Sequence, residues 1–136
     1  MDKVFVDTDV ILDFLLDREP FTLDAAKVFS LAEKKKLHAC TTGLVFANAY
    51  YVLRKLASHK KVVEKLAELS QWVDIIGLPK IAVTNALKSG FSDFEDALQY
   101  FSAKEAGVKI ILTRNVKDYK HSELAVMTPE IYIRQS

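Results

Sequence analysis

The side chains best suited to chemistry in this chain are three aspartates that lie in two short segments. Asp7 directly follows the apolar run 4–6, and Asp93 and Asp96 precede a second apolar run at 108–112. Asp93 and Asp96 are three residues apart, so a helix would present both carboxylates on one face. The three groups can act together only if the fold brings the two apolar runs side by side.

Carboxylates within a few ångströms of one another repel, and at least one of them is driven toward its protonated form. A divalent cation removes this conflict. Mg²⁺ prefers oxygen ligands and keeps several waters, so one or two direct carboxylates suffice, and we expect these to be Asp7 and Asp96. Such a bound ion can activate water and offset the charge of a phosphate, which indicates hydrolysis of a phosphate ester.

Each acid also has a structural explanation. Asp7 or Asp9 can cap the helix that follows the first apolar run. The segment Ser92-Asp93-Phe94-Glu95 fits a capping box with Ser92 as N-cap, in which case its acidity serves the helix dipole. The joint pattern therefore carries more weight than any single acid.

The elements that must position these groups alternate between strand-like and helical patterns. Strands are predicted at 4–6, 37–41, 75–78, 108–112 and 124–127, and helices at 10–16, 21–35, 42–57, 62–72, 79–88, 93–106 and from Pro129 onward. This alternation predicts an α/β fold with three layers, in which helices flank a mainly parallel sheet of four to five strands. Ligands collect beyond the carboxyl ends of such strands, where the segment Thr113-Arg114-Asn115 leaves the run 108–112.

Composition sets the remaining limits. The 136 residues are 50% hydrophobic, enough for one core, so we expect a single domain over 1–136. No apolar run approaches the length of a membrane span and the start does not resemble a signal peptide, so a cytoplasmic protein without membrane contact is expected. The net charge of +1 provides no global field for nucleic acid, so any RNA contact must be local.

Three segments resemble the motifs of PIN domains. They are VFVDTDVIL at 4–12, DFEDALQ at 93–99 and IILTRNVKDY at 110–119, and the resemblance extends in order and spacing over nearly the whole chain. It is particularly to bacterial VapC-like proteins, many of which are toxins paired with an antitoxin. The resemblance implies a PIN-like fold, an endoribonuclease that uses Mg²⁺ or Mn²⁺ to hydrolyse RNA, a homodimer and an antitoxin protein as partner.

The resemblance also implies roles for individual residues. Asp7 matches the first acid of the family, and Asp96 matches the acid that precedes Ala-Leu at a helix start. Asn115 matches a position that is often Asp or Asn, and Asp118 matches an acid that precedes an aromatic residue. Thr113 corresponds to the hydroxyl residue near the metal.

One position departs from the family pattern. The second family acid, usually Glu, falls in the segment 42–50, where this sequence has Asn48. An amide there removes one negative charge, which predicts weaker metal affinity, with Asp93 as the group able to compensate. The departure leaves room for an inactive or narrowly specific member.

Basic residues near the predicted site are candidates for phosphate contacts. Arg114 and Lys117 lie beside the expected mouth and would hold phosphates on either side of the scissile bond. Lys104 and Lys120 would extend that track.

Two other functions stay open. A protein with the PIN fold and a weakened site, marked by Asn48, would be an RNA-binding or partner-binding module. A strand followed by Asp7-Thr8-Asp9 also resembles the nucleophile motif of haloacid-dehalogenase-type phosphatases, in which Asp7 would be phosphorylated and Asp9 would be the acid-base. That family usually places its late acidic pair after a strand, whereas Asp93 and Asp96 precede one.

Overall fold

Five short strands form one parallel sheet at the centre of the structure, a computed structural model that describes residues 1–135. The strands are β1 (Lys3–Val6), β2 (His38–Thr42), β3 (Asp74–Ile76), β4 (Ile110–Leu112) and β5 (Ala125–Met127). Their order across the sheet is β3-β2-β1-β4-β5, and all four pairings are parallel. The predicted fold class is therefore confirmed.

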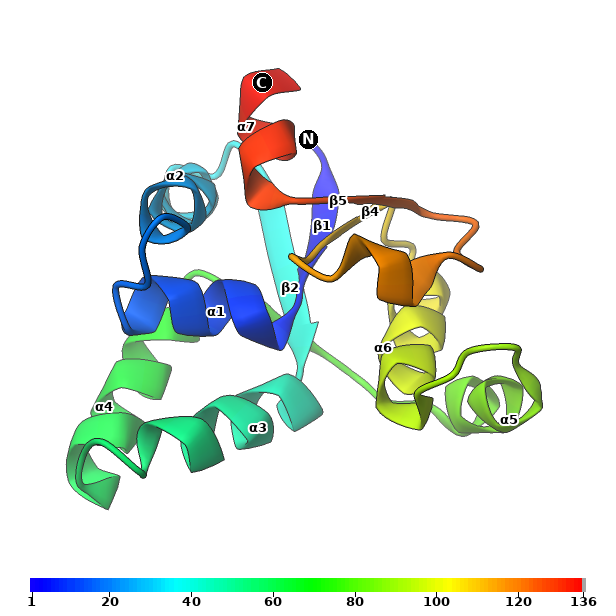
Figure 1. Cartoon of the computed structure of the whole chain (residues 1–136), viewed down its shortest axis with the longest axis horizontal. Coiled ribbons are helices and arrows are strands. Elements are labelled where there is room, and N and C mark those ends of the chain that lie inside the picture. The colour runs from blue at the N-terminus through cyan, green and yellow to red at the C-terminus, as the bar shows by residue number, and fades with distance from the viewer. Residues whose placement is uncertain (136) are drawn as a thin grey trace.

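Helices connect and cover the strands. They are α1 (Thr8–Leu15), α2 (Thr22–Glu33), α3 (Gly43–Leu53), α4 (His59–Leu69), α5 (Lys80–Lys88), α6 (Phe94–Glu105) and α7 (Pro129–Gln135), with a short 3-10 helix η1 (Val116–Tyr119) after β4. Figure 1 shows α1 and α2 to one side of the strands and α5 and α6 to the other. None of the helices within residues 1–135 combines the length and hydrophobicity needed to span a bilayer. Position 136, the last of the expected domain, lies outside the described residues.

The pairing of β1 with β4 decides where the site forms. Val6 is opposite Leu112 in the register, and the backbone N–H of Asp7 donates to the carbonyl of Leu112 at 3.0 Å. The next residue of each strand, Asp7 and Thr113, therefore emerges at the same edge of the sheet. This confirms the condition on which the sequence-based site depended.

The core is centred on β1, whose Val4, Phe5 and Val6 are fully buried. A strand covered on both faces reads as a continuous apolar run, as β1 does. A second, smaller apolar cluster joins α5 to α6 through Ala82, Ala86, Ala97 and Leu98. It anchors the helix that carries Asp96.

Several predicted boundaries were wrong, with local causes. The helix expected over 42–57 ends at Leu53, and the one expected over 62–72 begins at His59 because the side chain of Ser58 caps it. The strand expected over 108–112 pairs only from Ile110. Gly107 has a left-handed backbone (φ 77°), and the N–H of Val108 is used to close α6 on the carbonyl of Ala103 at 3.0 Å.

Candidate metal centre at the sheet edge

Asp7 lies at the junction of β1 and α1, where it caps the helix. Its carboxylate accepts the N–H of Thr8 at 2.8 Å, the hydroxyl of Thr113 at 3.0 Å and the hydroxyl of Tyr119 at 3.2 Å. Burial raises the pKa of Asp7, although these hydrogen bonds lower it, and the charge of Asp118 adds to the rise. The choice between Asp7 and Asp9 as helix cap is thus resolved in favour of Asp7.

Asp96 reaches the same place from the first turn of α6. Its carboxyl group is half-buried, and burial is the main cause that raises its pKa to about 7. Four negative charges add to the rise: those of Asp93, Asp7, Asp118 and Glu95. The charges of Asp7 and Asp96 therefore compete within one site, as the sequence predicted.

Asp9 holds the loop that follows β4. Its Oδ2 accepts the backbone N–H of Arg114 at 3.0 Å and the side-chain amide of Asn115 at 3.1 Å. The hydroxyl of Thr113 lies 3.3 Å from the same oxygen and can donate either to Asp9 or to Asp7. Burial, followed by the charge of Asp7, raises the pKa of Asp9 to about 6.

These groups surround an open cavity of about 270 Å³. Its lining residues are Asp7, Thr8, Asp9, Leu12, Arg18, Asn48, Glu95, Asp96 and Asn115. The structure therefore brings together four of the predicted site residues: Asp7, Asp96, Asn48 and Asn115. Thr113 lies fully buried beneath the cavity, in contact with Asp7.

Other predicted site residues lie outside the cavity wall. Asp93 caps α6 by accepting the N–H of Asp96 at 2.9 Å, so the predicted capping box with Ser92 as N-cap is wrong. Its carboxylate is thereby engaged in the helix start. Asp118 and Lys117 are exposed on η1, where Asp118 acts on Asp7 and Asp96 through its charge.

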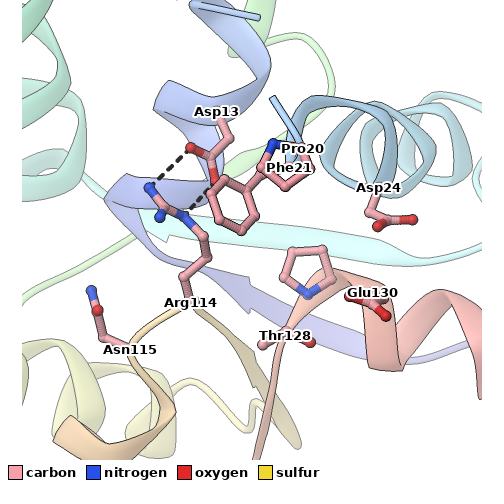
Figure 2. A pocket seen from close by; sticks show the side chains of 9 residues that line it. Asp13, Pro20, Phe21, Asp24, Arg114, Asn115, Thr128 and Glu130 are labelled. Atoms are coloured by element: carbon pink, nitrogen blue, oxygen red, sulfur yellow. Dashed lines mark hydrogen bonds and ion pairs between the residues drawn. The ribbon is translucent and has the colours of Figure 1, made fainter. Parts of the chain in front are cut away.

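Arg114 has a partner that the sequence did not reveal. Its Nη2 donates to Oδ1 of Asp13 at 3.1 Å, and its Nε lies 2.8 Å from Oδ2 in an ion pair. Figure 2 shows this pair beside the ring of Phe21, whose centroid lies 4.1 Å from the guanidinium carbon of Arg114. Asp13 is only 1% exposed. The guanidinium is therefore committed to a buried carboxylate, and a role in phosphate binding stays a prediction.

A second pocket, of about 280 Å³, opens next to this ion pair. It is lined by Asp13, Pro20, Phe21, Asp24, Arg114, Asn115, Thr128, Pro129 and Glu130 (Figure 2). Asn115 lines both this pocket and the acidic cavity. Lys104, which was predicted to extend a basic track, pairs with Glu123 at 3.2 Å, and the track stays a prediction.

The acidic cavity fits a hydrated divalent cation. Within residues 1–135, no three His, Cys, Asp or Glu side chains converge closely enough to form a complete metal cage. Mg²⁺ does not need one, because it keeps several waters and takes one or two carboxylates directly. The Oδ1 atom of Asp9 is buried without a hydrogen-bond partner, which is costly unless a further group satisfies it.

Three contributors to the site were not predicted for this role. Asp9 was assigned to a cap or to phosphatase chemistry, and Tyr119 was noted only as an aromatic residue after an acid. Glu95 was assigned to a capping box, but it accepts a hydrogen bond from the side-chain amide of Asn48 across the cavity. The signal available for Tyr119 was its place four residues after Asn115, which does not by itself reveal a contact with Asp7.

Comparison with known proteins supports the same fold. A model of the PIN domain family matches residues 3–117. Ribonuclease VapC1 of Aquifex aeolicus (strain VF5) is 31% identical over 134 residues, which cover 95% of this chain and 92% of the relative.

Solved structures of similar shape include toxins of bacterial pairs. A toxin-antitoxin complex from Klebsiella pneumoniae matches with a TM-score of 0.71 at 18% identity, over 93% of this chain and 97% of that one. VapC20 of Mycobacterium tuberculosis, a toxin that cleaves the sarcin-ricin loop, matches with a TM-score of 0.63 at 19% identity, over 79% and 86%. The expected PIN-like fold is confirmed.

Proposed function

Because this chain belongs to the PIN-domain family, we propose that its acidic cavity binds Mg²⁺ or Mn²⁺ and hydrolyses RNA phosphodiesters as an endoribonuclease. The observation that carries the proposal is the meeting of Asp7 and Asp96 in one cavity without a basic partner. Within residues 1–135, no ion pair involves either carboxylate. Two carboxylates that lack a basic partner and meet at the carboxyl edge of a parallel sheet are suited to binding a cation.

In this proposal each side chain of the site has its own role. Asp7 and Asp96 would hold the metal, and the chemistry that it would supply there is a more acidic water and positive charge beside the phosphate. Thr113 and Tyr119 hold the carboxylate of Asp7 in place by donating to it. Asp9 holds the loop that carries Asn115, whose side chain faces the cavity and can contact the substrate.

Asp118 and Lys117 would act at the rim. Asp118 adds negative charge near Asp7 and Asp96 from η1, which strengthens the attraction for a cation. Lys117, exposed on the same element, would meet the phosphate on one side of the scissile bond. Asp93 supports the site through the start of α6, where it caps the helix that bears Asp96.

The partners follow from the relatives. The toxin-antitoxin complex among the structural matches supports an antitoxin protein as second partner, with this chain as the toxin and RNA as its substrate. We also propose that it is a cytoplasmic homodimer. Large apolar side chains remain exposed on α5, including Leu87 at 72% and Ile81 at 51%, which supports self-association. Light scattering of the purified chain tests the dimer.

A second candidate function is an RNA-binding or partner-binding module with a weak catalytic site. The specific observation in its favour is Asn48, which lines the cavity where the family pattern has an acid. This function predicts that RNA is retained but not cut in Mn²⁺. The phosphatase alternative is set aside, since the chain belongs to the PIN family and Asp9 is engaged by the loop after β4.

The deciding experiment compares wild type, Asp7→Asn and Asp96→Asn on mixed RNAs in Mn²⁺, with and without chelator. Glu105→Gln, at the far end of α6, is the matched control. Wild type and control should cut RNA only with metal, and either Asn variant should lose about 100-fold or more. Equal cutting by all variants, or none by wild type over broad conditions, would overturn the proposal.

A further inference from the structure

The wall of the acidic cavity formed by α3 lacks a carboxylate. Asn48 is the α3 side chain that lines the cavity, and its amide carries no charge. The cation proposed for this cavity would then meet Asp7 from β1 and Asp96 from α6 with nothing negative opposite them. Asp9 offers only its buried Oδ1, because its Oδ2 accepts hydrogen bonds from the loop that follows β4.

Glu95 brings a carboxylate to this gap from the other side. It is in the first turn of α6, directly before Asp96, and its side chain lines the same cavity. The amide nitrogen of Asn48 donates to Oε1 of Glu95, which joins α3 to α6 across the cavity. Within residues 1–135, no other hydrogen bond or ion pair engages Glu95, so Oε2 is available to a ligand.

The contact with Asn48 matters because Glu95 is exposed. A free glutamate on a surface helix samples several rotamers, and fixing it costs side-chain entropy. A hydrogen bond between a neutral amide and an ionised carboxylate is among the stronger protein hydrogen bonds, so it can hold one rotamer. Asn48 therefore serves to position the carboxylate of Glu95, which belongs to α6.

Asp93 is less suited to this task, although the sequence pointed to it. Its Oδ1 accepts the N–H of Asp96, and moving it would leave the first turn of α6 uncapped. Removing an N-cap destabilises the helix. Glu95 has no comparable structural commitment.

We propose that Glu95, positioned by Asn48, supplies from α6 a third carboxylate that acts on the metal through bound water and not as a direct ligand, in place of the acid that the family pattern puts on α3. The cavity thereby keeps a third negative charge, which comes from α6 and not from α3. This inference rests on the proposed metal-dependent function.

The test measures Mn²⁺ binding by isothermal titration calorimetry, independent of RNA cleavage. The variants are Glu95→Gln, Asn48→Ala, the exchange Asn48→Glu with Glu95→Gln, and Glu105→Gln as matched control on the same helix. Circular dichroism and thermal unfolding without metal show that each variant is folded. Mn²⁺ affinity should fall about 10-fold in Glu95→Gln and less in Asn48→Ala, and the exchange should return it to within about 3-fold of wild type.

A double variant tests whether Asn48 affects Mn²⁺ affinity by positioning Glu95 or independently of it. Adding Asn48→Ala to Glu95→Gln should cause almost no further loss, because Asn48 acts through Glu95. Unchanged Mn²⁺ affinity in Glu95→Gln, with loss in Asp7→Asn, overturns the inference and leaves the proposed function standing. Loss in Glu95→Gln that the exchange does not recover also contradicts the replacement. No Mn²⁺ binding by wild type, or equal binding by Asp7→Asn, contradicts the proposed function itself.

Discussion

Helix α1 carries a partly buried carboxylate at its start, Asp7, and a fully buried one further along, Asp13, and the two have different partners. Asp13 is 1% exposed and both of its oxygens face the guanidinium of Arg114. Asp7 receives three neutral donors and no basic side chain. A buried charge that the protein neutralises by itself supports the fold, whereas one that is only held in place is available to a ligand.

The largest expected effect is at Asp7, where a substitution should lower RNA cleavage strongly without lowering the free energy of unfolding. Asp7→Asn should lose about 100-fold or more in RNA cleavage, because the metal loses a charged ligand. Its metal-free stability should be unchanged or higher, since Asn also caps helices and a desolvated charge is removed. Urea unfolding with chelator checks the second half, and a clear loss of stability would show that Asp7 is structural.

The opposite outcome is expected at Arg114. Arg114→Ala leaves Asp13 buried with only Arg18, at 3.9 Å, as a distant partner, so unfolding free energy should fall by about 3 kcal/mol. Replacing both residues, as Asp13→Asn with Arg114→Met, should recover part of that loss. Normal stability in Arg114→Ala with weakened RNA binding would instead support the predicted phosphate contact.

A smaller effect is expected at Tyr119, which is 2% exposed and donates to Asp7. Tyr119→Phe keeps the packing and removes the hydroxyl, so Mn²⁺ affinity should fall by up to about 10-fold. Calorimetric titration checks this, with Tyr51→Phe on the exposed surface as control. No change in affinity would mean that Thr8 and Thr113 suffice to orient the carboxylate of Asp7.

The smallest effect concerns pH. Asp96 has a pKa of about 7 in the folded chain, against an ordinary 3.8, so the metal-free fold binds a proton there that the unfolded chain releases. This contribution to stability is complete below about pH 4 and is lost as pH rises through about 7, by about 1 kcal/mol after allowance for exposure. Urea unfolding at pH 5 and 7.5 should show a smaller loss of stability in Asp96→Asn than in wild type, the remainder coming from Asp9 and Asp7, whose pKa values are also raised. An identical pH slope in the two proteins would argue against a perturbed Asp96.

The parts of the site that the sequence could predict are those set by strands. Apolar runs located β1 and β4, and the rule that ligands gather at the carboxyl ends of parallel strands selected Asp7 and the segment after Leu112. Asn48 and Asp96 could be placed at the same cavity by resemblance to a family. Each of these inferences depends on the backbone path alone.

The parts of the site that the sequence did not predict depend on contacts between side chains. The Arg114 and Asp13 pair joins positions 101 apart, and no periodic pattern records such a contact. Ser92 and Asp93 are adjacent and both suit an N-cap, so only the extended backbone at Asp93 (φ −125°, ψ 123°) decides between them. The direction of Glu95 toward Asn48 depends on how α3 and α6 meet, which local sequence does not specify.

The bond between Thr113 and Asp7 joins residues 106 positions apart. During synthesis from the amino terminus, β1 and α1 emerge early, but the loop that holds Asp7 and Asp9 emerges only when β4 has left the ribosome. Until then the aspartates have no hydroxyl or amide from that loop to fix them. A nascent chain of this protein would therefore lack an ordered acidic cavity until most of its length has been translated.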